Sequence, residues 1–293
     1  MIALDALNAA DRDQFAAALG DIFEHAPWVA HEAHAARPFP TLAALLAALA
    51  EAVRSAAPAR QLALIKGHPD LAGKAARAGT ITTDSQAEQA SAGLDRLSEE
   101  ELARFQRLNS AYGDKFGIPF IICVRRHTRD SILRQFERRL HNDQAAEHDA
   151  ALSEIFRIAA LRLDGRVSAP DRLKVHGRLS THVLDTYGGQ AAAGVVVELV
   201  EMPGTGDFRP IAQAVTNHDG RTDRPLIDGR PIPIGVYELR FAVGDYFARR
   251  GTPVADPAFL DVVPVRFSVA EPEGRYHVPL LMTPWSYSTY RGS

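Results

Sequence analysis

The chain has 293 residues, with 46% hydrophobic and 24% charged residues, a composition that is ordinary for a globular protein. Its formal net charge of −3 gives no basic surface for nucleic acid or for an anionic membrane. We therefore expect neither nucleic acid nor a membrane as a partner.

The cysteine content and the apolar runs bear on the compartment. A single cysteine, Cys123, excludes an intrachain disulfide, which is typical of a reducing compartment. Its apolar neighbours favour a buried, unreactive thiol. No apolar run reaches the roughly 18 residues that cross a bilayer, and the first residues lack the basic region of a signal peptide. We expect a cytoplasmic protein.

Residues 1–164 are predicted to form an all-α domain. In residues 41–59, apolar side chains recur at three- and four-residue spacing among many alanines, which is the pattern of an amphipathic helix. Segments 12–20, 98–112, 128–141 and 145–163 share this pattern. Asp11 is placed to cap the first of these segments, and Ser98 with Glu101 predicts a capping box.

Residues 165–172 contain a glycine, a proline and several polar residues, and are predicted to be a linker. From residue 173 to 293, strand-like runs recur at 174–184, 194–200, 211–216, 235–243, 264–269 and 277–282. Residues 217–220 and 227–229 are predicted turns, and residues 245–250 a short helix. The sequence therefore predicts a multidomain protein, in which an all-α helical domain precedes a β-sandwich with one short helix.

Two histidines and an arginine are candidate catalytic residues of the second domain. His182 ends the first predicted strand, Arg221 follows a turn, and His277 lies in the last long strand. A neutral imidazole can take a proton from water near pH 7. A guanidinium group stays charged and can hold the oxygens of a planar heterocycle. These three side chains suffice to hydrolyse an activated amide without a metal.

Two other interpretations of these histidines remain open. A single histidine in a strand is often a hydrogen-bonded structural residue. His182 and His277 are also conceivable zinc ligands, although no cysteine or close pair of carboxylates completes such a site. We expect no metal and no cofactor.

Four motifs of the second domain occur in an order that resembles a known family: Ser-Thr-His-Val-Leu-Asp at 180–185, Asn-His-Asp-Gly-Arg at 217–221, Tyr-His-Val-Pro-Leu-Leu at 276–281 and Tyr-Arg-Gly-Ser at 290–293. They resemble the transthyretin-related hydrolases that open 5-hydroxyisourate. The terminal motif separates this group from the hormone-carrying transthyretins. The resemblance implies a transthyretin-like sandwich that forms a homotetramer. It also implies active-site roles for His182, Arg221, His277 and Ser293, with Tyr290, Arg291 and Gly292 lining the substrate pocket.

Four separated stretches carry the candidate site of the first domain: residues 67–71, 85–89 and 120–124, and Arg162. Taken singly, each stretch has an ordinary structural interpretation. His68 follows a helix break and could be a solvated turn residue. Glu88 could be an exposed helix residue, residues 120–124 could be core, and Arg162 a surface charge. On composition alone the first domain is a helical domain without an assigned activity.

As an ordered set these stretches resemble the decarboxylases of 2-oxo-4-hydroxy-4-carboxy-5-ureidoimidazoline (OHCU), and the resemblance extends to residues 19–30 and 138–142. It implies an all-α decarboxylase that works without a cofactor and makes dimer contacts. His68 would be the acid/base residue, and Glu88 would hydrogen-bond the substrate. The implied substrate-binding residues are Pro69, Ser85, Gln86, Ala87, Gln89, Phe120, Ile121, Ile122, Cys123, Val124 and Arg162.

The two resemblances together predict a bifunctional enzyme of urate degradation. Its substrates would be the small molecules 5-hydroxyisourate and OHCU, and its product (S)-allantoin. Two alternatives remain open from the sequence. In the first, only one of the two domains is active. In the second, the chain is a transthyretin-like protein that binds a small ligand or scaffolds a partner.

Overall fold

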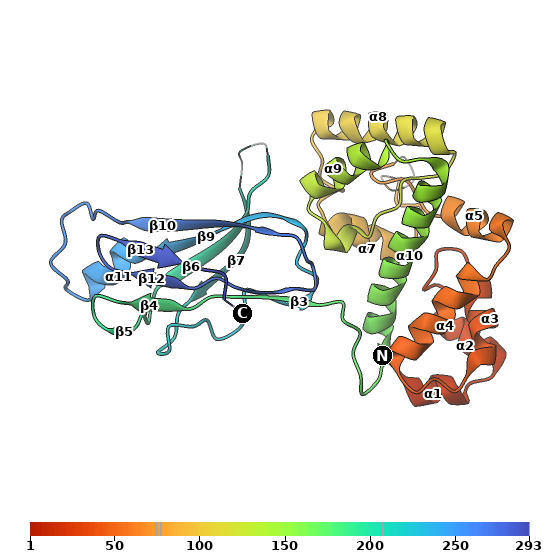
Figure 1. The fold of residues 1–293 in the computed structure, drawn as a ribbon, viewed down its shortest axis with the longest axis horizontal. Coiled ribbons are helices and arrows are strands. Elements are labelled where there is room, and N and C mark those ends of the chain that lie inside the picture. Colours follow the sequence, from red (N-terminus) through yellow and green to blue (C-terminus); the bar gives the residue numbers. More distant parts are fainter. Residues whose placement is uncertain (74–75, 77, 205, 207, 293) are drawn as a thin grey trace. The chain divides into compact units, whose positions relative to one another are not determined.

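The structure is a computed structural model that describes residues 1–73, 76, 78–204, 206 and 208–292. The chain divides into two compact units, Met1–Arg125 with Ser131–Val175 and Arg126–Asp130 with His176–Ser293. The first unit is mainly helical and the second is mainly built from strands (Figure 1). The predicted fold class, a helical domain followed by a β-sandwich with one short helix, is confirmed.

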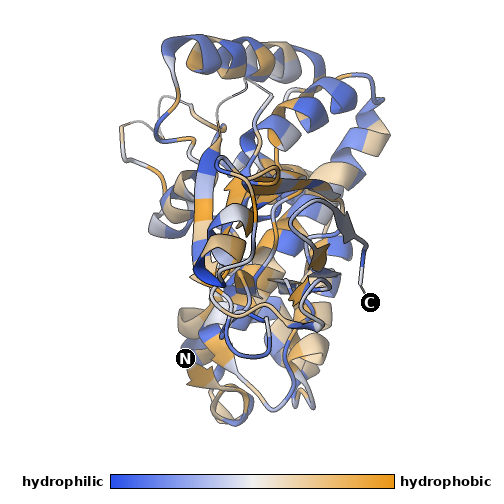
Figure 2. Ribbon diagram, turned by 90° about the vertical axis from the view of Figure 1, so that its left-hand side faces the viewer, coloured by the Kyte–Doolittle hydropathy of each residue, from blue (hydrophilic) through white to orange (hydrophobic). Residues whose placement is uncertain are grey.

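Residues 4–166 contain the helices that follow one another along the first part of the chain. Their bounds are α1 (Leu4–Ala9), α2 (Arg12–Leu19), α3 (Trp28–Ala33), η1 (His34–Ala36), α4 (Leu42–Arg54), α5 (Pro58–Lys66), α7 (Thr83–Ser91), α8 (Glu99–Phe116), η2 (Val124–Arg126), α9 (Arg129–Arg139) and α10 (Gln144–Arg166). Hydrophobic and hydrophilic residues alternate along several of these helices (Figure 2), as expected for helices that cover an apolar core.

Both predicted helix caps are present. Asp11 accepts the backbone N–H of Gln14, and Ser98 forms a complete capping box with Glu101. The single helix predicted over residues 41–59 is wrong in one respect. It ends at Arg54, and a new helix begins at Pro58, because proline has no N–H to continue a helix but fits its first turn.

Residues 165–175 pack against the helical unit. Helix α10 continues to Arg166, and β2 (Val167–Ser168) then pairs in parallel with β1 (Ile2–Ala3). The carboxylate of Asp171 accepts the backbone N–H of Leu42 at 2.9 and 3.1 Å, at the N-terminus of α4. A carboxylate in this position satisfies free N–H groups and complements the helix dipole.

In its described residues, the second unit contains three sheets and the short helix α11 (Val243–Arg249), which confirms the predicted helix. The sheet orders are β10-β9-β6-β7, β11-β3-β8 and β13-β12-β4-β5. Strand bounds are β3 (Gly177–Ser180), β4 (Val183–Asp185), β5 (Gln190–Ala191), β6 (Val196–Glu201), β7 (Arg209–Val215), β8 (Ile227–Arg230), β9 (Gly235–Ala242), β10 (Val262–Val269), β11 (Arg275–His277), β12 (Leu280–Met282) and β13 (Tyr287–Thr289). Alternate residues of β6 and β9, among them Val197, Leu199, Leu239 and Phe241, are fully buried in its core.

Two predicted strands are each divided into two. The run 174–184 forms β3 and β4, and the run 277–282 forms β11 and β12. Strand β3 pairs in parallel with β11 in one sheet, and β4 pairs in parallel with β12 in another. Both segments therefore leave one sheet and enter the next side by side. The apolar pattern continues across this crossing, so it could not reveal the break.

One turn prediction also needs correction. Residues 227–229 are part of β8, which pairs with β3 through an irregular register rather than forming a free turn. The aromatic segment after Met282 turns back and forms β13 antiparallel to β12. Among the described residues, no single helix is long and apolar enough to cross a membrane. Only α4 and α5 taken together have the required length and apolar composition, and they are bent by 111° at their junction.

Candidate active sites

The helical unit contains a pocket that collects most of its predicted site residues. The loop after α5, helix α7, the segment 120–124 and helix α10 all contribute to its lining. The predicted residues that line it are His68, Pro69, Ser85, Glu88, Gln89, Phe120, Ile121, Ile122, Val124 and Arg162. The cavity that they enclose has a volume of about 30 Å³.

His68 is buried, and its Nδ1 atom lies 3.0 Å from the carbonyl oxygen of Leu64. A carbonyl can only accept, so Nδ1 carries the hydrogen when the ring is neutral, and Nε2 keeps a lone pair. Burial lowers the pKa of His68 to about 4. His68 is therefore neutral at pH 7 and can accept a proton from a bound molecule.

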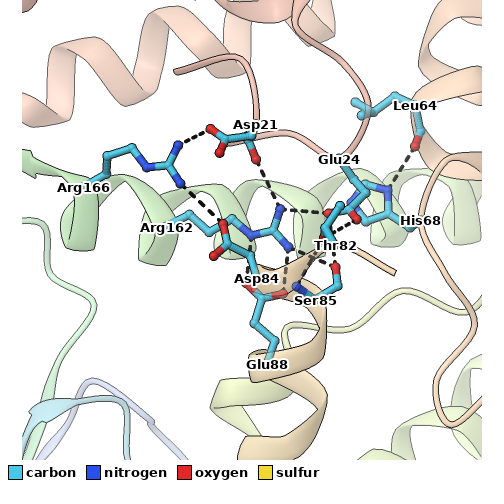
Figure 3. Close-up of polar contacts among 10 residues, drawn as sticks. All are labelled: Asp21, Glu24, Leu64, His68, Thr82, Asp84, Ser85, Glu88, Arg162 and Arg166. Atoms are coloured by element: carbon cyan, nitrogen blue, oxygen red, sulfur yellow. Dashed lines mark hydrogen bonds and ion pairs between the residues drawn. The ribbon is translucent and has the colours of Figure 1, made fainter. Parts of the chain in front are cut away.

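Arg162 crosses from α10 to two carboxylates (Figure 3). Its Nε and Nη2 atoms donate to the two oxygens of Glu88 at 2.8 and 2.9 Å, and Nη1 donates to Glu24 at 3.0 Å. Burial by itself lowers the pKa of Arg162, but its bonds to Glu88 and Glu24 outweigh burial and raise it. The pocket thus contains a permanent positive charge between two acids.

The two acids have different surroundings. Burial raises the pKa of Glu88, and this effect outweighs the stabilising bond from Arg162. Burial also acts to raise the pKa of Glu24, but the Thr82 hydroxyl and Arg162 overcome it and lower the pKa. Glu24 therefore stays ionised, whereas Glu88 takes up a proton more readily.

Glu24 is a site residue that the sequence interpretation missed. It lies within the stretch 19–30 that carried the family resemblance, and it is buried like the neighbouring Phe23 and Ala26. The next residue, His25, has a positive φ of 51°, an uncommon conformation that is found most often at turns and functional sites. An acid that directly follows the apolar pair Ile22-Phe23 was the signal available in the sequence.

Gln89 has a second role, and the predicted site residues Gln86, Ala87 and Cys123 do not line the pocket. Gln89 lines the pocket and also accepts the backbone N–H of Ala72 at 2.9 Å, which holds the loop after His68. Gln86 is exposed and bonds the carbonyl of Gly79, and Ala87 borders a neighbouring hollow. Cys123 is buried, as the sequence predicts, with its backbone N–H bonded to Glu154.

A buried ion pair supports the apolar wall of the pocket. Arg139 donates through Nη1 to the carbonyl of Ile121 at 2.7 Å, and through Nε to Glu147 at 2.7 Å. Its guanidinium lies 4.5 Å from the ring centre of Phe120. Tyr112 also donates to Glu147. These contacts fix the backbone of residues 120–121 where it faces the pocket.

The β-sandwich places its predicted histidines at the crossing between sheets. The backbone N–H of Val278 donates to Ser180, and that of Leu280 donates to His182, which holds the two crossing segments together. His182 forms a single antiparallel bridge with Arg221, and His277 forms one with Gly292. The chain therefore brings four predicted site residues together from distant parts of the sequence.

The ring nitrogens of both histidines have defined partners. Nε2 of His182 lies 2.8 Å from the carbonyl of Asp219, so it carries a hydrogen and leaves Nδ1 as the acceptor. Nδ1 of His277 lies 3.0 Å from the hydroxyl of Ser180. Burial, followed by the nearby charges of Arg221 and His182, lowers the pKa of His277. His277 is therefore neutral at pH 7.

The C-terminal segment returns to His277. The backbone N–H of Gly292 donates to the His277 carbonyl at 2.8 Å. A Cβ atom at residue 292 would lie 2.6 Å from Cδ2 of the His277 ring, so glycine is required for this approach. Arg291 lies over the ring of Tyr276, and Tyr290 is exposed. The predicted role of Ser293 falls outside the described residues.

A helical unit with His68 and Arg162 at its pocket and a β-sandwich with paired histidines define a fused two-domain protein. Residues 8–164 match the family model for OHCU decarboxylase, and residues 179–292 match that of the HIUase/transthyretin family. The chain belongs to the OHCU decarboxylase family, with a HIUase/transthyretin domain joined after it. The predicted order of the two domains is confirmed.

Curated relatives and a solved structure agree with both matches. A 5-hydroxyisourate hydrolase of Deinococcus radiodurans is 59% identical over 119 residues, which are 40% of this chain and 98% of that protein. The OHCU decarboxylase of Haloferax volcanii is 41% identical over 168 residues, 57% of this chain and 98% of that protein. A crystal structure of (S)-allantoin synthase covers all of both chains with 33% identity and a TM-score of 0.51.

Proposed function

We propose that this chain is a bifunctional enzyme of urate degradation. Its β-sandwich hydrolyses 5-hydroxyisourate to OHCU, and its helical unit decarboxylates OHCU to (S)-allantoin. One observation carries the proposal: the residues predicted for each activity lie together within one unit. The decarboxylase residues line one pocket of the helical unit, and the hydrolase residues are paired in the β-sandwich. The fused domains and the full-length similarity to an (S)-allantoin synthase support it.

In the decarboxylation, His68 is the base and Glu88 is the acid, and their pKa values are shifted in opposite directions. Neutral His68 accepts a hydrogen bond from the hydroxyl of the substrate through Nε2. The bond between carbon and carboxylate then breaks, and its electron pair moves into the adjacent conjugated C=N group. Glu88 is placed to supply the proton that replaces CO2. Delivery from one side of the pocket explains a single enantiomer.

The hydrolysis uses the imidazoles of the β-sandwich. His182 or His277 takes a proton from a water molecule, and the resulting hydroxide attacks a ring carbonyl of 5-hydroxyisourate. The oxygen of that carbonyl gains negative charge, which the guanidinium of Arg221 stabilises. The terminal residues 290–292 border this site, and their closeness to His277 supports a role in holding the substrate.

The oligomeric state and the compartment belong to the same proposal. The β-sandwich exposes several aromatic residues, among them Tyr187 at 53%, Trp285 at 53% and Tyr287 at 45%. Large exposed aromatic side chains are typical of an interface between subunits. We infer a tetramer through the β-sandwich, further dimer contacts through the helical unit, and a cytoplasmic location.

The test is an assay of the full chain with freshly generated 5-hydroxyisourate. Ultraviolet absorbance follows the decay of 5-hydroxyisourate and of OHCU, and circular dichroism follows the formation of chiral allantoin. We expect both decays to accelerate and the product to be (S)-allantoin. Acceleration of one decay alone would leave one active domain, and acceleration of neither would favour a binding protein.

A further inference from the structure

The guanidinium of Arg162 has all five of its N–H groups engaged by the protein. Besides the three bonds to Glu88 and Glu24, Nη2 donates to the hydroxyl of Ser85 at 3.3 Å, and Nη1 approaches the carbonyl of Asp21 at 3.5 Å. Five N–H groups are all that a guanidinium has. A substrate that carries a carboxylate can bind to Arg162 only by displacing one of these partners.

The two carboxylates on Arg162 are held with unequal strength. The side chain of Glu24 is 1% exposed, and it also accepts hydrogen bonds from the hydroxyls of Thr82 at 2.7 Å and Ser85 at 3.1 Å. The side chain of Glu88 is 15% exposed and, within the described part of the chain, bonds only to Arg162. Glu88 is therefore the partner that can leave.

The charge of the pocket also requires a change when the substrate binds. With Glu24 and Glu88 both ionised, these two acids and Arg162 together carry one negative charge, which opposes the entry of an anion. Burial raises the pKa of Glu88, so protonation removes this charge at a smaller cost there than at Glu24, whose pKa is lowered. The bidentate Nε and Nη2 edge of Arg162 then fits a second carboxylate.

We propose that Glu24 is the permanent counter-charge of Arg162, and that the substrate carboxylate replaces Glu88 on the Nε and Nη2 edge while Glu88 takes up a proton from solvent. The proposal rests on the decarboxylase function proposed above. Loss of CO2 breaks a carbon–carbon bond, moves its electron pair into the C=N group and consumes one proton. Glu88 already carries this proton. Once CO2 has left, the Glu88 carboxylate returns to Arg162.

Proton uptake on binding tests the exchange in the full-length protein. The probe is hydantoin-5-acetate, a heterocycle with a carboxylate that does not decarboxylate readily, and neutral allantoin serves as the matched ligand. Titration calorimetry at pH 7.5 in buffers with different ionisation enthalpies gives the number of protons bound. We expect an uptake of about one proton per hydantoin-5-acetate by linkage, and none with allantoin.

Three variants separate the roles of the acids. Glu88→Gln should bind hydantoin-5-acetate without proton uptake, because no carboxylate remains to be displaced. Glu24→Gln should lower the uptake well below one proton, because the probe can then pair with Arg162 while Glu88 stays. Glu32→Gln, which removes an exposed acid paired with Arg60, should keep the uptake of the unmodified protein.

Binding of the probe without proton uptake, or failure of the probe to bind, would overturn the exchange. Equal uptake by Glu24→Gln and the unmodified protein would overturn the role of Glu24. Decarboxylation of OHCU by the unmodified protein is measured in parallel. Activity without proton uptake contradicts the exchange alone, whereas the absence of activity contradicts the proposed function.

Discussion

At the scale of single residues, the two candidate sites share one principle: a histidine is kept neutral beside an arginine that stays charged. Burial is the main cause at both His68 and His277, and the nearby arginine adds to it. In the proposed mechanism, each imidazole accepts a proton at pH 7, while each guanidinium stabilises negative charge on a substrate.

His68→Ala should abolish stereospecific decarboxylation and leave the hydrolase intact. Loss of a general acid–base residue typically lowers a rate by about 10²- to 10⁴-fold, and His68 belongs to a unit separate from His182 and His277. Chiral analysis of the products formed from OHCU prepared beforehand measures the effect. His31→Ala, in the same unit but outside the pocket, is the control. Unchanged formation of (S)-allantoin by His68→Ala would reject the role of His68.

The hydrolase should lose activity in acid with a midpoint below pH 6.5. Burial, Arg221 and His182 all disfavour the protonated form of His277, so its pKa lies below the ordinary value of 6.5. The neutral form of His277, which is the active form, therefore still predominates at pH 6.5 and is lost only at lower pH. The pH profile of kcat/KM for 5-hydroxyisourate measures this. An acid midpoint at or above pH 6.5 contradicts the assignment of His277.

At the scale of elements, the C-terminal segment approaches His277 too closely to accommodate a side chain at residue 292. Gly292→Ala places a Cβ atom 2.6 Å from the His277 ring. Overpacking typically costs about 1–3 kcal/mol, which corresponds to a loss of roughly 5- to 150-fold in kcat/KM if the segment shifts. Gly113→Ala, at an exposed position of α8 with open space, controls for general effects. A Gly292→Ala variant with full hydrolase activity would show that this approach does not matter.

The buried pair behind the decarboxylase pocket should be important for stability. Arg139→Gln leaves Glu147 buried without its cation, and breaking such a pair typically costs about 3–5 kcal/mol. Arg104→Gln removes an exposed pair with Glu137 and should cost less than about 1 kcal/mol. Urea unfolding of the two variants compares the free energies. Similar values for both would contradict the role of Arg139 in the wall.

Elements with a local signal were predictable from the sequence. The caps at Asp11 and Ser98 depend on residues three positions apart, so the structure reproduces them. The crossing that divides β3 from β4 depends on a partner segment about one hundred residues away, and the apolar pattern does not record it. Glu24 was missed for the same reason, because its partners Thr82 and Arg162 are distant in the sequence.

At the scale of the whole molecule, the expected tetramer can be measured directly. Light scattering coupled to size exclusion should give four times the mass of one chain. Trp285→Asp places a charge on the exposed aromatic surface of the β-sandwich, and it should lower the mass. Glu198→Lys, an exposed charge change on β6, is a control that should not. A monomer in the unmodified protein contradicts the proposed assembly.

The bond between Asp171 and the start of α4 determines where the chain can be cut to study each activity alone. A fragment that stops at Asp164 would lack the β2 strand and leave the backbone N–H of Leu42 without its acceptor. Such a fragment would lose stability for reasons unrelated to catalysis. A cut after Val175 keeps these contacts with the helices that they support.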